Sequence, residues 1–462
     1  MTCSSHPRGP TGYPILGNAL SVFRGALPFL HACAADYGDL VPLWFFRKRL
    51  LFVNHPDYIG HVLATCHRQV MKGISRRSDH ILLGDGISLS EGDVWLRERR
   101  LIQTAFYRER LSDYSGDVVA LTDRMLGEWQ DGEVRDVAVD LTRLTLAIIG
   151  KTLIHLDAKD GAELATAVSH AMACRAARVK SPQMLLPDRV PSPLTLRLRQ
   201  ARRRIDVLVQ RSIDARRESG KDRDDLLSLL LDARDPDGRA PSDRQVRDEV
   251  VTILVGGHET VADLLVWSWY LLSQHPDVEA NLLKELDATL GGRLPTVDDL
   301  PRLPYTGMVV TEALRLYPPA SVLTREAITD FAIGGYPVTR GTEIILSPWV
   351  MHRDPRYFVE PQVFRPERWA DGLAHRLPRY AYFPFGGGPR LCIGKSFATM
   401  EAILMLATVV PRAHLALRPG QQVEAEEVPT LHPKNGLLMR VRLRQRESMG
   451  SALQPSCEGT RR

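Results

Sequence analysis

The chain has 462 residues, of which 44% are apolar and 25% charged, and its net charge is +5. These are ordinary values for a globular protein, and the mild basic excess does not require nucleic acid as a partner. The six cysteines have no close spacing, which argues against a zinc ribbon or a disulfide framework and favours a reducing, cytoplasmic setting. No apolar run in the sequence resembles a signal sequence or a membrane span, so we expect no membrane anchor.

The first elements expected in chain order are two short strands. Apolar runs at residues 40–46 and 49–54 predict a hairpin, and helical periodicity dominates the chain after it. We therefore expect a mainly α protein with a small β-rich region, organised as a single domain over residues 1–446. The expected portions are β-rich at about 38–60 and 320–350, helical at about 95–320 and 394–410, and a polar tail at 447–462.

The longest expected helix begins at Ser242, which together with Gln245 forms a pattern typical of a capping box. Apolar residues continue along one face to about Gln274, so the helix is long enough to cross a whole domain. Gly256 and Gly257 interrupt its middle, where each glycine disfavours the helix by about 1 kcal/mol. The two glycines are therefore expected to loosen this helix locally.

The segment "FPFGGGPRLCIGKSF" at residues 383–397 combines three consecutive glycines with a lone cysteine. A phosphate-binding loop needs a different glycine spacing before its Lys-Ser pair, and here a cysteine intervenes. A nucleophilic cysteine needs a nearby histidine, and nothing in the sequence places His352 or His375 beside it. A single cysteine can also bind a metal as a thiolate, as in the haem sites that activate oxygen. The plain alternative is a buried structural cysteine in a tight turn.

Physical arguments favour the thiolate ligand. Cys392 directly precedes the last expected helix, whose first N–H groups would stabilise an anionic sulfur and lower its pKa. Glycines at 386–388 would let the backbone pass close to a large flat ligand, and Gly394 would avoid a clash with it. Phe385 would shield the sulfur from water, and Arg390 could reach an acidic group at the ligand's edge.

Five positions of this loop, Phe385, Gly388, Arg390, Cys392 and Gly394, match the haem-binding signature of the cytochrome P-450 family. The sequence resembles that family over nearly its whole length. The resemblance implies the multihelical P-450 fold and a bound haem b whose iron has the Cys392 thiolate as its axial ligand. The residues that it implies as haem contacts are Trp95, Arg99, Gly256, Arg325, Phe385, Gly386, Arg390 and Gly394.

The sequence "TEALRLYPP" contains Glu312 and Arg315, which share a helix face and can form an ion pair. Taken alone, this pattern indicates an ordinary surface pair worth little. It is similar, however, to the family's Glu-x-x-Arg motif, and Arg368 in "FRPERW" matches the third member of that cluster. The resemblance therefore implies a buried structural cluster behind the cysteine loop.

The sequence "VGGHETVADLL" at residues 255–265 resembles the family's oxygen-binding stretch. A zinc-protease interpretation fails because it needs a second histidine where Ala262 stands. The Thr260 hydroxyl is expected to bond back to the carbonyl of Gly256. The resemblance implies that Thr260 also lies beside bound dioxygen and that Glu259 relays protons to it.

The resemblance implies a monooxygenase that inserts one oxygen atom from O2 into an apolar substrate, such as a terpenoid, a fatty acyl chain or a polyketide. It also implies a cytoplasmic monomer of the bacterial type that acts in secondary metabolism. Electrons would come from a separate acidic ferredoxin or flavodoxin, docked on basic residues such as Arg97, Arg100 and Lys395. Two alternatives are a peroxide-using peroxygenase or isomerase and a non-catalytic haem sensor; the Glu259–Thr260 pair argues against both. The expected pocket residues are Leu82, Leu83, Ile253, Gly257, Val322, Leu323 and Leu431.

Overall fold

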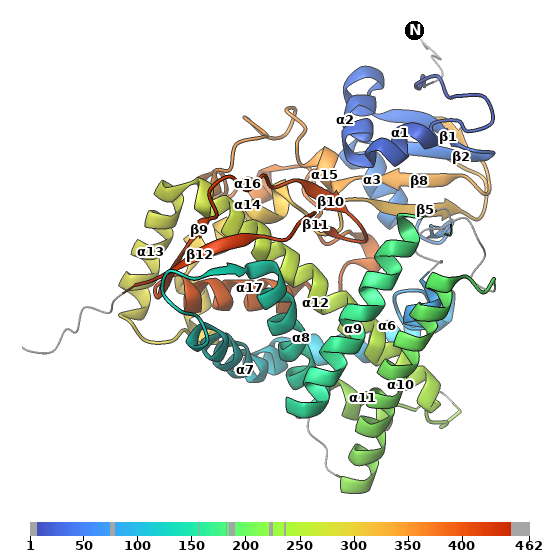
Figure 1. The fold of residues 1–462 in the computed structure, drawn as a ribbon. Helices are drawn as coiled ribbons and strands as arrows, with labels where there is room; N and C mark the ends of the chain where they lie inside the picture. The colour runs from blue at the N-terminus through green and yellow to red at the C-terminus, as the bar shows by residue number, and fades with distance from the viewer. Residues whose placement is uncertain are drawn as a thin grey trace, which may run out of the picture.

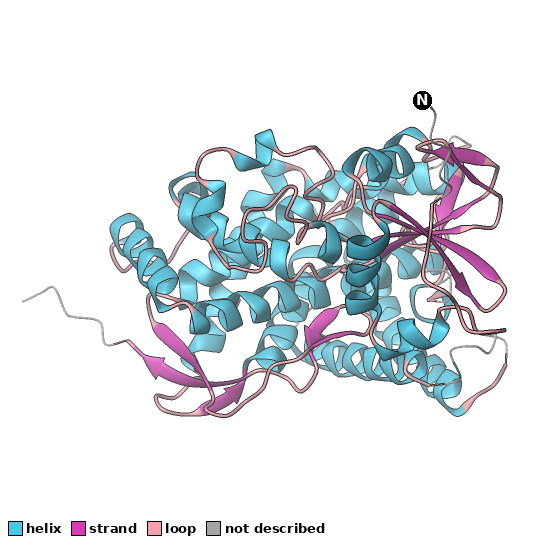
Figure 2. Ribbon diagram, turned by 90° about the horizontal axis from the view of Figure 1, so that it is seen from above, coloured by secondary structure: helices cyan, strands magenta, loops and turns pink. Residues whose placement is uncertain are grey.

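The structure is a computed structural model that describes residues 7–73, 79–156, 158–181, 183, 190–220, 225–234 and 237–444. The expected polar tail at 447–462 lies outside these residues. Helices form most of the molecule, and the strands form one group at the corner of β1 and β2 and a second, separate group that includes β9 and β12 (Figures 1 and 2). The mainly α architecture with a small β region is therefore confirmed.

The helical body is built around one long central helix, α12 (Asp243–Gln274), which packs along α8 (Val137–Ile154). Its capping box is confirmed, because the Ser242 side chain accepts from the Gln245 N–H and the Gln245 side chain accepts from the Ser242 N–H. Its most apolar window would be long enough to cross a membrane, but 72% of that window is buried inside the protein, as in a core helix. The other long helices are α6 (Gly92–Ile102), α7 (Arg108–Gly127), α9 (Ala158–Val179), α10 (Pro193–Ser219), α13 (Pro276–Leu290), α14 (Pro304–Leu316) and α17 (Lys395–Val409).

Short helical segments connect these elements. They include α1 (Ala19–Arg24), α2 (Ala26–Tyr37), α3 (Pro56–Gly60), η1 (His61–Thr65), α5 (His80–Leu83), η2 (Gln103–Phe106), α11 (Leu226–Asp232), η4 (Val297–Arg302), α15 (Pro348–Met351), η5 (Pro366–Trp369), α16 (Leu373–Arg376) and η6 (Gly388–Arg390).

The main sheet joins distant parts of the chain in the order β1-β2-β8-β5-β3. The predicted hairpin is confirmed, with antiparallel pairing of the first two strands, and β2 then pairs in parallel with β8. The two β-rich portions expected from the sequence are thus one sheet. Its strands are β1 (Leu40–Phe45), β2 (Lys48–Val53), β3 (Val70–Lys72), β5 (Leu323–Ala327) and β8 (Glu343–Leu346).

Further strands lie outside the expected β-rich portions. A three-stranded sheet in the order β4-β12-β9 and a hairpin of β10 with β11 form from the last part of the chain and one short strand before α8. A second hairpin, β6 with β7, falls within the expected 320–350 region. The bounds are β4 (Val134–Asp136), β6 (Phe331–Ile333), β7 (Tyr336–Val338), β9 (Ala413–Leu417), β10 (Ala425–Glu427), β11 (Leu431–Pro433) and β12 (Leu438–Leu443).

Candidate functional site

The cysteine loop lies between η6 and α17. The Cys392 N–H donates to the Phe385 carbonyl at 3.0 Å, which closes the loop on itself. Gly386 and Gly388 have φ angles of +71° and +64°, a backbone region that other residues enter only with strain. The loop conformation therefore requires glycine at both positions.

The glycines of this loop serve protein packing more than we expected. A Cβ at Gly387 would collide with the Tyr380 ring, and one at Gly388 would collide with the backbone carbonyl of Leu63 in η1. Packing against the protein therefore already requires glycine at these two positions, and the expected close approach of the backbone to a flat ligand stays a prediction. A Cβ at Gly394 would meet only Phe106, at 3.8 Å, so this glycine leaves open space beside the cysteine.

Cys392 keeps solvent-accessible surface, although protein surrounds its thiol on most sides. Desolvation raises the pKa of the Cys392 thiol, while the Gly394 N–H, Arg99 and Lys395 lower it. The expected donors are thus present, but the expected net lowering of the pKa is wrong for the protein by itself, because desolvation outweighs them. A thiolate here needs a further positive charge, which a bound metal ion would supply.

Basic and aromatic side chains from α6 meet the cysteine loop. Arg99 Nη1 donates to the Leu391 carbonyl at 2.6 Å, and the Arg390 guanidinium lies 4.3 Å from the centre of the Trp95 ring. The structure therefore brings Trp95, Arg99 and Arg390 together next to Cys392. Arg325 lies on β5, where its Nη1 donates to the Thr324 carbonyl at 2.8 Å.

Sequence reasoning missed the carboxylate that orders this cluster. Glu91, just before α6, forms an ion pair with Arg390 and accepts from the Lys72 N–H of β3 at 2.8 Å. Arg390 also donates to the Ser90 carbonyl at 3.2 Å. An acidic residue at a helix start is an ordinary signal, and it gave no hint of a partner 299 residues away.

The Glu-x-x-Arg pair and Arg368 form one buried cluster. Arg315 and Arg368 each donate to Glu312 Oε1 at 2.8 Å, and neither Glu312 nor Arg315 has exposed side-chain surface. Trp369, which the sequence did not single out, donates to Glu312 Oε2 at 2.8 Å. The buried cluster that the resemblance implied is therefore present, and the surface pair that the pattern alone would indicate is not.

His352 connects this cluster to the cysteine loop. The Arg315 side chain donates to the His352 carbonyl at 2.9 Å, and His352 Nε2 accepts from the Phe383 N–H at 2.9 Å. Burial lowers the pKa of His352 well below its ordinary value, so the ring is neutral and can accept this bond. His352 therefore positions the start of the loop and does not act as a base toward the thiol of Cys392.

On α12, the Thr260 hydroxyl donates to the Gly256 carbonyl at 2.8 Å, as the sequence predicts. Gly256 is exposed, and a Cβ placed there would meet no described atom within 4 Å, whereas a Cβ at Gly257 would collide with Ile149 of α8. The two glycines thus face different surroundings. Gly257 allows Ile149 of α8 to pack closely, and its place in a substrate pocket stays a prediction.

Asp263 is a buried acid one turn after the partly accessible Glu259, and sequence reasoning did not identify it. Its Oδ2 atom has no hydrogen-bond partner among the residues that the structure describes. Burial, and then the neighbouring Glu259, raise the pKa of Asp263, and the Thr430 side chain lowers it. The spacing of four residues between the two acids was the available signal.

The expected pocket residues divide into two groups. Ile253 and Leu323 keep accessible surface, whereas Leu82, Leu83 and Leu431 are buried in the protein. Leu82 and Leu83 pack in the main core, and their backbone carbonyls accept hydrogen bonds from Arg202 and Thr252. Val322 is half-buried against the cluster formed by α2 and β1. Pocket lining is therefore contradicted for the three buried leucines.

The sequence model of the cytochrome P-450 family matches residues 7–440. The chain belongs to this family, and it is accordingly an oxidoreductase of the monooxygenase type. Two bacterial relatives are cyclooctat-9-en-7-ol 5-monooxygenase of Streptomyces melanosporofaciens, 35% identical over 89% of this chain and 90% of that protein, and pentalenene oxygenase of Streptomyces avermitilis, 34% identical over 95% and 97%.

Solved structures agree with this assignment. A retinoic acid-bound cyanobacterial member of the family, CYP120A1, superposes with a TM-score of 0.85 at 26% identity, covering 95% of this chain and 99% of its own. A cytochrome P-450 haem domain superposes with a TM-score of 0.86 at 28% identity, covering 96% and 98%. The P-450 fold that the loop motif implied is therefore confirmed.

Family membership implies a haem, and the residues present fit one. Cys392 offers an accessible sulfur, and Gly256 and Gly394 leave open the space that a side chain would occupy. Arg99, close to the sulfur, and Arg390, which here pairs with Glu91, are cations that could bind the carboxylate edge of a haem.

Proposed function

We propose that the chain binds haem b through Cys392 and hydroxylates an apolar terpenoid with one oxygen atom from O2. The observation that carries this proposal is the accessible Cys392 thiol, which lies close enough to Arg99 for the arginine to lower its pKa. When bound, a thiolate-ligated haem supplies the activation of dioxygen.

The chain's own residues would orient and neutralise the group. Arg99, Trp95 and Arg390 would hold its carboxylates through charge-assisted hydrogen bonds, with Arg325 as a further cation. Gly386 and Phe385 would approach one face of the ring. Positive charge at the sulfur would stabilise the thiolate against the desolvation that now raises its pKa.

Thr260 and Glu259 would move protons on the opposite side. The Thr260 hydroxyl donates its proton to the Gly256 carbonyl, so its lone pairs remain available to accept a hydrogen bond from water. Glu259 is partly accessible, so its carboxyl group can exchange protons with solvent and pass them to a water held by Thr260.

The proposed substrate class is supported by the names of the relatives and by the apolar residues expected to line the substrate pocket. The names of both Streptomyces relatives specify terpenoid substrates, pentalenene and cyclooctat-9-en-7-ol. Ile253 and Leu323 present apolar accessible surface that suits such a molecule. We further propose one domain over residues 1–446, a cytoplasmic monomer, and an acidic ferredoxin or flavodoxin that docks near Arg97, Arg100 and Lys395.

The test of the haem site is spectroscopic. Reduced protein under carbon monoxide should show the strongly red-shifted Soret band of thiolate-ligated haem, and Cys392→Ser should lose it. A Cys392→Ser variant that kept the band would overturn the ligand assignment. A panel of terpenes and fatty acids, screened for a high-spin Soret shift, then tests the substrate class.

A peroxygenase is the second candidate, and the Glu259–Thr260 pair disfavours it because peroxide already carries the protons that this pair would deliver. Turnover of the same substrate should be compared with a ferredoxin system and with hydrogen peroxide. Activity with peroxide alone would replace the monooxygenase proposal by this alternative.

A further inference from the structure

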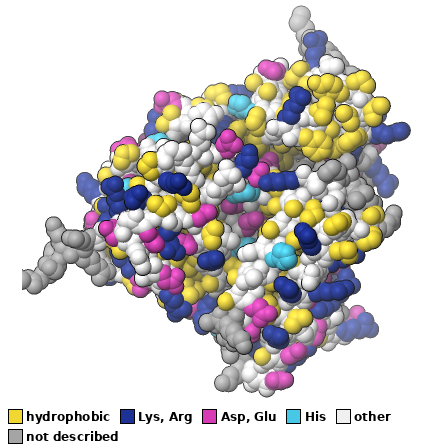
Figure 3. Space-filling model, viewed as in Figure 1, with side chains coloured by type: hydrophobic (Ala, Val, Ile, Leu, Met, Phe, Trp, Pro, Cys, Tyr) yellow, Lys and Arg dark blue, Asp and Glu magenta, His cyan; other side chains and the backbone are white. Residues whose placement is uncertain are grey.

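Large apolar side chains are exposed together at the corner of the molecule formed by α1, β1 and β2. The exposed fractions are 86% for Ile15, 55% for Phe23, 52% for Tyr13 and 45% for Trp44. Figure 3 shows apolar surface gathered at this corner, with basic side chains at its margin. A contiguous apolar surface on a folded protein usually marks a contact with a partner or a membrane. We call this surface, with Phe46, the corner patch.

The backbone holds the tip of the corner patch outward. Ile15 has a φ of +69° and Phe46 a φ of +53°, a conformation that is costly for large side chains and especially for a β-branched one. Tyr13 and Gly17 exchange two backbone hydrogen bonds of 2.8 Å across Ile15, and the Phe46 N–H donates to the Leu16 carbonyl at 3.1 Å. The protein thus maintains strain that keeps an apolar side chain in solvent.

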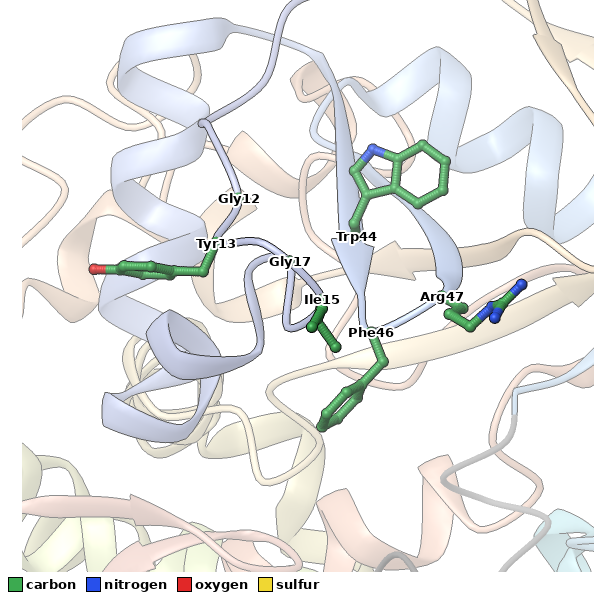
Figure 4. A pocket seen from close by; sticks show the side chains of 7 residues that line it. All are labelled: Gly12, Tyr13, Ile15, Gly17, Trp44, Phe46 and Arg47. Atoms are coloured by element: carbon green, nitrogen blue, oxygen red, sulfur yellow. The ribbon is translucent and has the colours of Figure 1, made fainter.

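The corner patch contains a shallow groove of about 410 Å³. Ile15 and Phe46 lie near its centre, while the Trp44 ring and the Arg47 guanidinium project outward from β1 and the turn after it (Figure 4). Amphipathic aromatic rings beside arginine are typical of side chains that lie at the boundary between water and lipid. The groove is therefore suited to chain-like apolar groups that carry an anionic head.

The charge around the corner patch is positive. Residues 7–50 contain five basic and two acidic side chains. Asp39 pairs with Arg356, and Lys48 pairs with Glu326 and Glu343. By contrast Arg8, Arg24 and Arg47 are exposed and form no ion pair within the described part of the chain. Each such residue near an anionic membrane surface contributes about 1 kcal/mol to binding.

We propose that the corner patch binds the surface of an anionic phospholipid bilayer. Ile15, Phe23 and Trp44 would enter the headgroup boundary, and the three arginines would face lipid phosphates. We propose a peripheral attachment: within the described part of the chain, α12 alone is long and apolar enough to cross a membrane, and 72% of its apolar window is buried in the protein. Its use rests on the proposed function, since a water-insoluble terpenoid partitions into the same bilayer; the binding itself does not depend on that function.

The test is co-sedimentation of the haem-loaded, full-length protein with vesicles of phosphatidylglycerol and phosphatidylcholine, and with vesicles of phosphatidylcholine alone. The anionic vesicles should bind the protein at least about tenfold more strongly, and high salt should reverse that preference. The double variant Ile15→Ser/Trp44→Ser and the variant Arg47→Glu should each lower binding about tenfold. Val359→Ser, at a residue exposed by 71%, is the matched control and should bind like the parent.

Brominated phospholipid gives an independent readout. It should quench the Trp44 fluorescence of the parent, and the quenching should be lost in Trp44→Phe, which keeps an aromatic side chain. Binding that is absent, or equal in the parent and the corner-patch variants, overturns the proposal. Analytical sedimentation without vesicles gives a further test. If the parent were a dimer and the same variants abolished it, the proposal would also be overturned, because a second copy of the chain would then cover the corner patch.

The carbon monoxide spectrum in vesicle-free solution separates the two proposals. A normal band without vesicle binding refutes the corner patch and leaves the haem assignment intact. Vesicle binding without the band refutes the haem assignment and leaves the corner patch intact.

Discussion

Arg315 donates two hydrogen bonds to Glu312 from the same face of α14, at 2.9 and 2.8 Å, and no part of either side chain is exposed. Removing the carboxylate would strand a buried guanidinium. We expect Glu312→Ala to lower the free energy of unfolding by about 3–5 kcal/mol, measured by urea denaturation.

The control is Arg244→Gln, because Arg244 and Asp85 form an ion pair on the surface. That variant should cost under about 1 kcal/mol. If Glu312→Ala were as mild as the control, the cluster would not be structural.

The Thr260 hydroxyl predicts a specific catalytic defect. Thr260→Ala removes the group that donates to the Gly256 carbonyl and should lower product formed per electron pair by about tenfold or more. Thr260→Ser keeps the hydroxyl and should retain most of the yield. Product and peroxide are measured together, and full yield from the alanine variant would exclude the proposed proton transfer.

Alanine substitutions at Gly386 and Gly388 distinguish the cost of backbone strain from the cost of a steric collision. Both have positive φ, so alanine at either position should cost about 1–2 kcal/mol. A Cβ at Gly388 would also meet the Leu63 carbonyl, whereas a Cβ at Gly386 would be 3.7 Å from Leu323. Thermal unfolding should therefore show Gly388→Ala as clearly the less stable variant, and equal stabilities would contradict this account.

Glu249 predicts how stability changes with pH. Burial, and then the neighbouring Glu98, raise the pKa of Glu249 to about 9, against about 4.3 in an unfolded chain. Between these values the folded state binds the extra proton, so stability falls as pH rises through this window and levels off above pH 9. Glu249→Gln cannot ionise and keeps an oxygen to accept from the Ile87 N–H, a bond of 2.9 Å in the parent.

Urea denaturation between pH 5 and 9 tests this expectation. Glu249→Gln should be more stable than the parent at the alkaline end and should show a flatter slope. Asp85→Asn, at an exposed carboxylate of the neighbouring loop, should leave the slope unchanged. A parent whose stability does not decline toward pH 9 would contradict a protonated Glu249.

Features that depend on residues close together in the sequence were predicted correctly. The Ser242–Gln245 cap and the Thr260–Gly256 bond each join residues within one helical turn, and both were read from spacing alone. The Cys392 loop needed a longer signature and a family resemblance. Once the loop was matched to the family, the fold could be predicted as well, because this motif is specific to one architecture.

Distant pairings were not predictable in the same way. Nothing near Glu91 in the sequence points to Arg390, and nothing near Asp263 predicts that Thr430 lies against it. The sign of the Cys392 pKa shift was also missed, because desolvation depends on how much protein surrounds the sulfur. Leu82 and Leu83 look like pocket residues by composition, but their burial in the main core depends on distant helices that pack against them and is visible only in three dimensions.

The bond from Arg99 to Leu391 spans 292 residues, and the parallel pairing of β2 with β8 closes a loop of similar length. Contacts of such separation form late, since the chain must first pay the entropy of closing the loop. On the ribosome, Leu391 and Cys392 are therefore added only when 70 of the 462 residues remain to be synthesised. Until then the Arg99 side chain lacks its Leu391 partner, although the whole of α6 is already present.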